Sequence, residues 1–168
     1  MFLMKDMKKT QLLTAKPFHL FAFCLLLSLQ VQAVTSRLYT SKYLTSGLIS
    51  CLCQDRQGFI WIGTEYGLNK FDGYHFTYYY HSQTDSTTVT DNDISSLYVD
   101  RDGTLWVGSS KGLSRYNRET DNFQRYQFPD GRTPRISTIT QTADGRLLLG
   151  SSGYGLYSYP PPLHFHPL

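Results

Sequence analysis

The amino-acid sequence predicts an all-β protein built from repeated units, and two observations carry this prediction. Residues 49–63 return nearly unchanged as residues 94–108, 45 positions further along the 168-residue chain. Within each copy, short runs rich in aromatic and β-branched residues alternate with tight-turn sequences, and these runs are too short for helices. Self-similarity at a period of about 40 to 45 residues indicates a repeat architecture whose unit is a small group of strands.

The repeat extends beyond this segment and occurs a third time. Residues 67–72 correspond to residues 112–117, and a weaker third copy spans residues 136–159. In the third copy, Leu148 takes the place of a tryptophan and Thr142 takes the place of the first aspartate. The sequence therefore predicts three successive units of similar structure.

Each unit is predicted to begin with a strand, a tight turn and a second strand. Asp55 and Asp100 stand at the first position of this turn, and Gly58 and Gly103 stand at the fourth. The carboxylate can accept hydrogen bonds from the amides of the turn, and glycine tolerates the geometry of its exit. Because the aspartates recur at one repeat position, we interpret them as turn formers rather than as a catalytic carboxylate pair.

Trp61 and Trp106 lie in the strand that follows this turn and are predicted to pack between adjacent units. A ligand needs a stacking platform once, whereas packing needs an anchor in every unit, so their recurrence favours the structural role. Outer strands are expected at residues 74–80 and 122–128, which are aromatic and partly alternating. The predicted structural positions of the repeat are Asp55, Gly58, Trp61, Gly63, Gly67, Asp100, Gly103, Trp106, Gly108, Gly112, Gly145, Gly150 and Gly155.

The size of the unit and its strand content together predict a partial β-propeller. We expect about three four-stranded blades, at residues 49–80, 94–128 and 136–168. Because closed propellers usually have four to eight blades, the chain is expected to be the leading fragment of a longer protein. Residues 38–43 are a candidate for the strand that completes the final blade of the ring.

The first 33 residues differ in kind from the repeats. Lysines precede an apolar run at residues 18–29, and Val31 and Ala33 are small residues at the third and first positions before a cleavage point. This pattern predicts a secretory signal peptide over residues 1–33, with residues 34–168 as the mature part. An uncleaved membrane anchor is the alternative, but the apolar run is shorter than the roughly 20 residues that a spanning helix needs.

Charge and motifs exclude several classes of function. The mature part carries 12 basic and 12 acidic side chains, so its formal net charge is zero. A nucleic-acid partner is not predicted, because a basic face would be its expected signature. The sequence contains no Gly-x-Ser-x-Gly elbow, no phosphate-binding glycine-rich loop with lysine and no His-Glu-x-x-His motif. We therefore predict no catalytic residue and no cofactor in this chain.

Two pairs of residues could suggest other chemistry. Cys51 and Cys53 alternate on a predicted strand, where extended geometry holds their Cα atoms near the upper limit of about 7 Å for a disulfide. We interpret them as small packing residues, with a strained or intermolecular disulfide as the alternative. His164 and His166 alternate like two ligands on a strand, but a metal site needs further ligands in a matching frame, so no metal site is predicted.

At these residues the chain resembles the two-component regulator propeller repeats of bacterial hybrid sensor kinases. The resemblance rests on residues 47–49 and on the run at residues 54–74, which reads QDRQGFIWIGTEYGLNKFDGY. It covers about residues 38–159 and is specific for the first two repeats. The third repeat departs from the pattern at Leu148 and Thr142.

The resemblance implies two seven-bladed propellers and a β-sandwich in the periplasm, which sense a nutrient such as a carbohydrate. It implies signalling through an inner-membrane helix to a cytoplasmic histidine kinase, and it allows a homodimer of the parent protein. The partners of this chain would then be the ligand and the remaining blades and signalling domains of the parent. No ligand-contact residue is carried over, because the repeat motif of the family is structural.

The sequence thus predicts that the chain is an exported, periplasmic, ligand-sensing segment of a hybrid two-component signalling protein and is not itself an enzyme. The alternative is a secreted propeller enzyme of the lyase or glycan-degrading kind. Its active residues would lie in loops at one end of the central channel.

Overall fold

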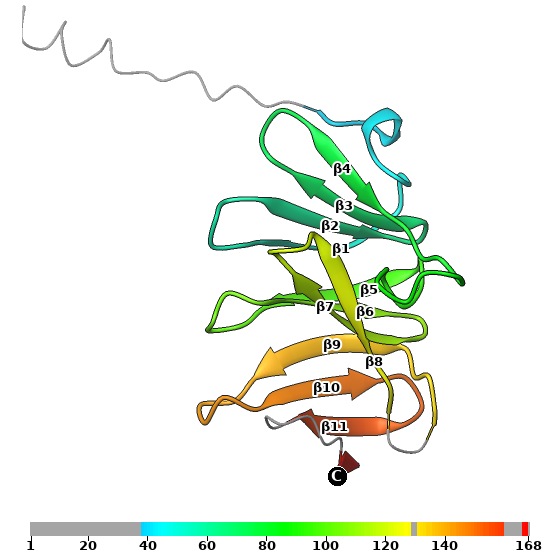
Figure 1. Ribbon diagram of the computed structural model, residues 1–168, viewed down its shortest axis with the longest axis vertical. Helices are drawn as coiled ribbons and strands as arrows, with labels where there is room; N and C mark the ends of the chain where they lie inside the picture. Colours follow the sequence, from blue (N-terminus) through cyan, green and yellow to red (C-terminus); the bar gives the residue numbers. More distant parts are fainter. Residues whose placement is uncertain (1–37, 129–130, 160–165, 168) are drawn as a thin grey trace, which may run out of the picture. The chain divides into compact units, whose positions relative to one another are not determined.

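Three antiparallel sheets of four strands each make up the part of the chain that the structure describes, residues 38–128, 131–159 and 166–167 of a computed structural model (Figure 1). The predicted signal peptide, residues 1–33, and His164 lie outside these residues. No helix in the described part is long and apolar enough to cross a membrane. The expected fold class, all-β with partial propeller blades, is confirmed.

Every sheet is a simple up-and-down succession of neighbouring strands, in the order β1-β2-β3-β4, β5-β6-β7-β8 and β9-β10-β11-β12. Blade 1 consists of β1 (Ile49–Gln54), β2 (Ile60–Thr64), β3 (Gly67–Phe71) and β4 (Phe76–Tyr79). Blade 2 consists of β5 (Ile94–Val99), β6 (Leu105–Ser109), β7 (Gly112–Asn117) and β8 (Asn122–Tyr126). Blade 3 consists of β9 (Ile136–Gln141), β10 (Leu147–Ser151), β11 (Gly155–Tyr159) and β12 (His166–Pro167).

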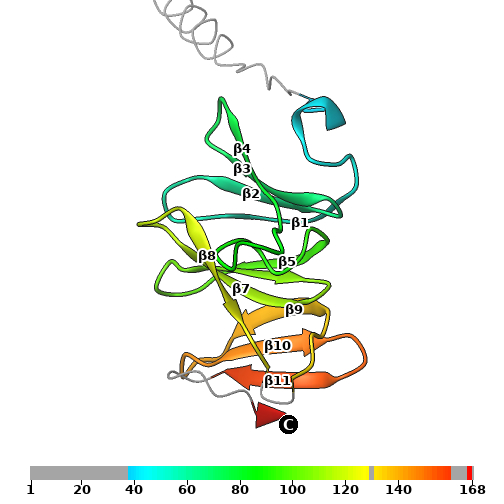
Figure 2. The same cartoon turned by 45° about the vertical axis from the view of Figure 1, so that its right-hand side comes forward.

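The blades stack face to face, with the first strands β1, β5 and β9 in succession (Figure 1), and the turned view of Figure 2 shows the same stacking. The hydrophobic core therefore lies between sheets rather than within one. One cluster of buried side chains fills the seam between blades 1 and 2, centred on Trp61 and Ile94. A second cluster fills the seam between blades 2 and 3, centred on Trp106 and Ile136.

The first turn of each blade has the same hydrogen-bonded form. The glycine N–H at its fourth position donates to the carbonyl oxygen at its first position, at 3.0 Å for Gly58, Gly103 and Gly145. The φ angles of these three glycines are 90°, 85° and 90°. Such positive values strain any residue with a Cβ atom, so glycine at this position follows from the turn geometry.

The outer strands are shorter than the sequence suggests. β4 begins at Phe76 rather than at Tyr74, because the Asp72 carboxylate accepts the backbone N–H groups of Tyr74 and His75 at 2.7 and 2.6 Å. These bonds hold residues 72–75 in a turn and delay the start of the strand. In blade 2, the residues after Tyr126 leave the sheet and begin the connection to blade 3.

Residues 38–43 are not a strand in this structure, whereas the expectation from the sequence concerns a complete ring, in which they would pair with the final blade. Ser41–Tyr43 form a single 3-10 turn, η1, closed by the Tyr43 N–H donating to the Thr40 carbonyl at 2.9 Å. A strand needs a neighbouring strand for its backbone groups. No described strand pairs with this segment, and its backbone bonds locally instead.

Candidate functional site

The first aspartate of blade 1 holds its own turn, the next strand and the following blade together. Asp55 Oδ1 accepts the backbone N–H groups of Gln57 and Phe59, both at 3.0 Å. Its Oδ2 accepts the indole N–H of Trp61 at 3.0 Å and Arg118 Nη2 of blade 2 at 2.8 Å. Burial acts to raise the pKa of Asp55, but the hydrogen bonds from Arg118 and Trp61 outweigh it and hold that pKa below its usual value.

Blade 2 repeats this arrangement within itself. Asp100 Oδ1 accepts the backbone N–H groups of Asp102 and Thr104 at 2.9 and 2.8 Å, and its Oδ2 accepts the indole N–H of Trp106 at 2.8 Å. In blade 3, the Thr142 hydroxyl fills the place of the carboxylate and accepts the Arg146 N–H at 3.0 Å. A hydroxyl can serve the turn, but it brings no negative charge to the seam.

Both tryptophans lie at the seams. Trp61 is fully buried and meets Tyr116 of blade 2 edge to face, with ring centroids 4.7 Å apart. Trp106 meets Tyr159 of blade 3 in the same way at 5.4 Å. Leu148, in the corresponding position of blade 3, is only half-buried. The structure thus gives both indoles a packing role between blades.

Glycines on the second strands allow the blades to approach closely. A Cβ atom on Gly63 would lie 2.7 Å from Cγ2 of Ile94, and one on Gly108 would lie 2.9 Å from Cγ2 of Ile136. Both isoleucines are fully buried. The same hydrogen bond recurs at both seams. The Ser95 hydroxyl donates to the Ile136 carbonyl at 2.7 Å, and the Ser50 hydroxyl donates to the Ile94 carbonyl.

The thirteen predicted repeat positions do not converge on one site. They are distributed over all three blades, in the first turns, at the seams and at the glycines that open the third strands. The structure places Asp55, Gly58, Trp61, Gly63 and Gly67 in blade 1. It places Asp100, Gly103, Trp106, Gly108 and Gly112 in blade 2, and Gly145, Gly150 and Gly155 in blade 3.

The two cysteines have the packing role that we expected for them. Cys51 and Cys53 are free thiols on β1, half-buried against the core between blades 1 and 2. Burial raises the pKa of the Cys51 thiol. Burial, together with the neighbouring Cys51 and Asp55, raises the pKa of the Cys53 thiol to about 12. Such a thiol is not a nucleophile at neutral pH, because the thiolate is the reactive form.

In the described part of the chain, no group of three or more His, Cys, Asp or Glu residues gathers to hold a metal ion.

A charged and aromatic cluster closes the rim of the seam between blades 1 and 2. Asp121 Oδ1 accepts the hydroxyl groups of Tyr79 at 2.7 Å and Tyr116 at 2.5 Å. Lys70 Nζ lies 3.7 Å from the same oxygen and 4.6 Å from the centroid of the Phe59 ring. Burial and the hydrogen bond to Asp121 both raise the pKa of Tyr79. The phenols therefore stay protonated and act as hydrogen-bond donors that join the two blades.

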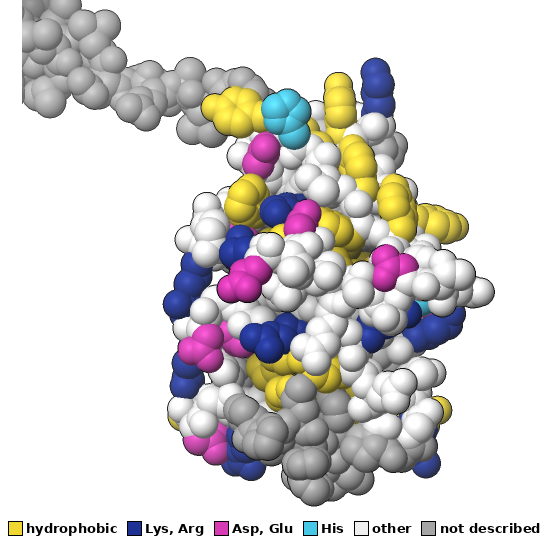
Figure 3. Space-filling view, viewed as in Figure 1, with side chains coloured by type: hydrophobic (Ala, Val, Ile, Leu, Met, Phe, Trp, Pro, Cys, Tyr) yellow, Lys and Arg dark blue, Asp and Glu magenta, His cyan; other side chains and the backbone are white. Residues whose placement is uncertain are grey.

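The outer strand of blade 1 exposes an unusual number of aromatic rings. Tyr74, Phe76, Tyr78 and Tyr80 occupy alternate positions in and beside β4, and we call these four residues the tyrosine ladder. The exposed fractions are 86% for Tyr74, 43% for Tyr78 and 51% for Tyr80. Figure 3 shows hydrophobic side chains gathered over blade 1, whereas polar and charged side chains dominate the surface of blade 2.

The base of the ladder is fixed by ring packing. The Phe76 ring stacks on Phe71, with centroids 4.5 Å apart, and lies nearly parallel to Tyr78 at 6.4 Å. The Tyr39 ring meets Phe71 and Phe76 edge to face at 5.0 and 5.8 Å. The Tyr78 hydroxyl donates to the Tyr43 carbonyl at 3.2 Å. The Phe76 and Tyr78 rings are thus held in defined orientations.

A small cleft of about 240 Å³ lies beside the ladder, where β4 meets blade 2. Residues 78–80 form one wall, and Asp85, Asp121 and Asn122 contribute to the other. Hydrogen bonds from Thr87 hold the pKa of Asp85 below its usual value, so this wall is anionic at neutral pH. The cleft therefore offers carboxylate and amide oxygens next to exposed aromatic rings.

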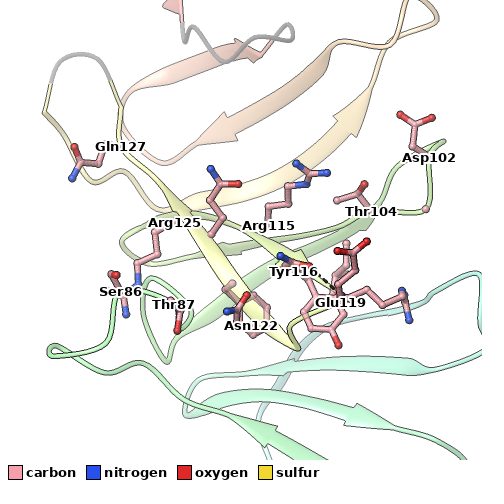
Figure 4. A pocket seen from close by; sticks show the side chains of 16 residues that line it. Ser86, Thr87, Asp102, Thr104, Arg115, Tyr116, Glu119, Asn122, Arg125 and Gln127 are labelled. Carbon is pink, nitrogen blue, oxygen red and sulfur yellow. Dashed lines mark hydrogen bonds between the residues drawn. The ribbon is translucent and has the colours of Figure 1, made fainter.

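A larger groove of about 970 Å³ lies over blade 2 along β7 and β8 (Figure 4). Arg115, Arg118 and Arg125 lie along it and would suit an anionic ligand. Arg118, however, binds Asp55 at 2.8 Å, and the Arg115 guanidinium lies 6.0 Å from the centroid of the Trp106 ring. These two cations are engaged in holding the fold, which argues against a site for anions.

The third arginine holds the connection between blades 1 and 2. Arg125 Nε donates to the Thr88 carbonyl at 2.7 Å, and its Nη2 donates to the carbonyls of Ser82 and Asp85, both at 2.8 Å. Residues 80–93 are thereby fastened over β8. Arg125 is consequently part of the scaffold and not a ligand for anything in the groove.

Two stretches of the sequence, residues 43–66 and 88–111, match the family Two component regulator propeller. Each stretch contains the end of a connection, the first strand, the Asp-containing turn and the tryptophan strand, which are the elements that build the seams. The chain carries two-component regulator propeller repeats.

Solved structures agree with this family. The extracellular domain of the hybrid two component system BT3049 from B. thetaiotaomicron is 31% identical over 78% of this chain, with a TM-score of 0.70. This chain spans 19% of the length of that domain. The extracellular domain of BT4673 from the same organism is 23% identical over 67% of this chain and 16% of its own, with a TM-score of 0.59.

Virginiamycin B lyase from Staphylococcus aureus is also similar, at 14% identity over 70% of this chain and 40% of its own, with a TM-score of 0.56. At these lower identities the likeness of BT4673 and of the lyase shows the propeller fold alone. No curated protein matches the sequence.

The regulator propeller repeats also explain why the sequence did not reveal the tyrosine ladder. The family pattern marks positions that are the same in every repeat, whereas a binding surface depends on positions that differ. Strand pairing places Tyr78 opposite Asn69 and Arg125 opposite Ser114, so Tyr78 and Arg125 hold the same position in blades 1 and 2. The turn glycines of the two repeats are 45 residues apart, whereas Tyr78 and Arg125 are 47 apart, so the repeat in the sequence does not align them.

Proposed function

We propose that this chain is the ligand-sensing propeller segment of an exported, hybrid two-component signalling protein that responds to a carbohydrate or another nutrient. The observation that carries the proposal is the pair of regulator propeller repeats, together with 31% identity to the extracellular domain of a hybrid two component system. The predicted signal peptide at residues 1–33 supports export. The histidine kinase and the inner-membrane anchor are proposed for the parent protein.

The contacts of the described blades favour a scaffold for binding over a catalytic site. Repeat positions such as Asp55, Trp61 and Asp100 are used in turns and seams. A rigid stack of blades can present ligand contacts at the positions that vary between repeats, and a propeller of this kind needs no chemistry of its own to sense a ligand.

The proposal is tested on the full-length protein in membrane vesicles. Addition of the sensed nutrient is expected to change autophosphorylation of the kinase, and it should raise the melting temperature of the protein because the ligand binds the folded state. N-terminal sequencing of the exported protein should show cleavage after Ala33. Chemical conversion of the sugar by the purified protein, without any change in phosphorylation, would instead support the alternative function, a secreted propeller enzyme.

A further inference from the structure

We infer that the rim of the seam between blades 2 and 3 binds the carboxylate group of a small organic acid. The inference is carried by a comparison with the seam between blades 1 and 2, where the same arrangement of side chains holds a carboxylate of the chain itself. It goes beyond the proposed function and does not depend on which nutrient the protein senses.

In the seam between blades 1 and 2, three donors gather around one carboxylate oxygen. The hydroxyl groups of Tyr79 and Tyr116 donate to Asp121 Oδ1 at 2.7 and 2.5 Å. The third donor is Lys70, whose Nζ lies 3.7 Å from that oxygen. Both tyrosine rings pack against Trp61, with centroids 5.6 and 4.7 Å from the indole centroid. A cation and two phenols placed by an indole therefore form a carboxylate-binding arrangement in this fold.

The seam between blades 2 and 3 repeats these donors at the same strand positions. Tyr126 holds the position of Tyr79, because each pairs with the second residue of the third strand of its blade. Arg115 is the fourth residue of β7, which is the position of Lys70 in β3. Tyr159 is the fifth residue of β11, which is the position of the second phenol donor in β7. A cation and two phenols are therefore placed alike in both seams.

The geometry of the rings is also alike in the two seams. Tyr126 and Tyr159 pack against Trp106, with centroids 5.6 and 5.4 Å from the indole centroid. The two tyrosine rings lie 5.8 Å apart at an angle of 69°, compared with 6.3 Å and 68° for the two phenols of the first seam. Burial raises the pKa of Tyr159, so its hydroxyl group stays protonated and can donate a hydrogen bond.

The cation of the second seam makes no ion pair within the described part of the chain. Arg115 is exposed, lines the groove over blade 2 (Figure 4) and lies 6.0 Å from the centroid of the Trp106 ring. Contact with an indole does not prevent a cation from binding a carboxylate. Lys70 shows this, because it lies 5.4 Å from the centroid of the Trp61 ring and also contacts Asp121. The guanidinium N–H groups of Arg115 can therefore serve an anion while the indole supports the side chain.

Blade 3 offers no counterpart of Asp121. That aspartate lies in the turn between β7 and β8. The residues between β11 and β12, residues 160–165, read PPPLHF and include neither aspartate nor glutamate. Asp102 and Glu119 are the carboxylates that line the groove, and neither forms an ion pair with Arg115. The three donors of the second seam thus suit a carboxylate that the repeat itself does not provide.

The donors favour a carboxylate over other anions. A guanidinium group matches the two oxygens of a carboxylate, and its single positive charge balances the single negative charge. A phosphate monoester carries nearly two negative charges at neutral pH and would need a further cation. The Tyr126 hydroxyl donates to Oε1 of the exposed Gln124 at 3.1 Å, and an ionised oxygen is a stronger acceptor than this amide. The groove of about 970 Å³ provides space for the rest of a small acid.

The test uses the full-length protein in detergent, with acetate as the probe and chloride at equal ionic strength as the reference. Saturation-transfer NMR of the acetate methyl group measures the affinity. Arg115→Gln should weaken acetate binding at least about tenfold, because it removes a charge-assisted contact. Arg115→Lys should keep the affinity within about threefold, since a lysine serves the first seam. Lys70→Gln, at the same repeat position, is the matched control and should change the affinity less than about twofold, because Asp121 already occupies that arrangement.

A further variant applies the same test to the first seam. Asp121→Gly removes the carboxylate there, and glycine accepts the φ of 50° at this position. Acetate should therefore raise the melting temperature of Asp121→Gly more than that of the unchanged protein, because it restores the lost carboxylate.

Three results would overturn the inference. The first is equal affinity of acetate for the unchanged protein and for Arg115→Gln. The second is stabilisation of Asp121→Gly by acetate without any binding to the unchanged protein, which would confine the carboxylate-binding arrangement to the first seam. The third is failure of acetate to bind the unchanged protein or to stabilise any variant.

Discussion

At the scale of the residue, one carboxylate can decide how two blades meet. Asp55 accepts hydrogen bonds from its own turn, from Trp61 and from Arg118 of the next blade. The role in the turn was predictable from the Asp-x-x-Gly spacing, because that interaction is local. The bond to Arg118 was not predictable, since residue 118 lies 63 positions further along the chain.

Replacement of Trp61 by alanine is expected to destabilise the protein by roughly 3 to 5 kcal/mol. The indole is fully buried, and its removal leaves a cavity at the seam and takes one of the two hydrogen bonds from Asp55 Oδ2, which keeps the one from Arg118. Urea unfolding of the full-length protein measures the change, with Leu148→Ala, the half-buried equivalent in blade 3, as the milder control. An unmoved midpoint combined with lost ligand affinity would make Trp61 a contact residue instead.

Acid should weaken the seam between blades 1 and 2 through Asp55. Its pKa is lower in the folded protein than in the unfolded chain, where an aspartate has a pKa of about 3.9. The carboxylate therefore contributes stability above that pH, and this contribution is lost as the pH falls through the folded-state pKa. As the pH is lowered from 7 to 2, the melting temperature of the Asp55→Asn variant should fall less steeply than that of the unchanged protein. Equal slopes for the two proteins would show that other carboxylates dominate.

At the scale of the element, local sequence patterns predicted the turns and strands, whereas the features that depend on distant backbone partners were missed. The first turns, the tryptophan strands and the opening glycines followed from spacing within about 20 residues of each other. The 3-10 turn at Ser41–Tyr43 and the late start of β4 at Phe76 did not, because each depends on backbone partners that the sequence does not name. The fastening of residues 80–93 by Arg125 was missed for the same reason.

The close approach of blades at Gly63 should make that position intolerant of any side chain. A Cβ atom there would lie 2.6 Å from Cys51 Sγ and 2.7 Å from Ile94 Cγ2, so Gly63→Ala should cost about 1 to 3 kcal/mol. Hydrogen exchange should speed up in β2 and in β5. Gly73→Ala is the control, because Gly73 has a φ of 99° and nothing within 4 Å of a Cβ. Its cost is one of backbone strain, and faster exchange in β5 for this variant would contradict the seam explanation.

At the scale of the whole molecule, the residues that the structure describes leave both ends of the stack of blades open. Ile94 and Ile136 are fully buried against the preceding blade, whereas Ile49, at the same repeat position in blade 1, is 50% exposed. At the other end, Leu68 and Leu113 are fully buried and their equivalent Leu156 is 39% exposed. Each end therefore presents apolar groups that the same repeat buries wherever a neighbouring blade is present.

We therefore predict that residues 34–168 in isolation self-associate or fold only in part, while a chain extended to a complete ring is monodisperse. Apolar sheet faces with unpaired edges attract further copies, because burial of that surface lowers the free energy. Light scattering and thermal unfolding of both chains measure the difference. Ile49→Lys, which places a charge on the open face of blade 1, should reduce scattering by the short chain, whereas Tyr66→Lys in an exposed turn should not. A monomeric short chain with one sharp unfolding transition would show that three blades suffice for an independent fold.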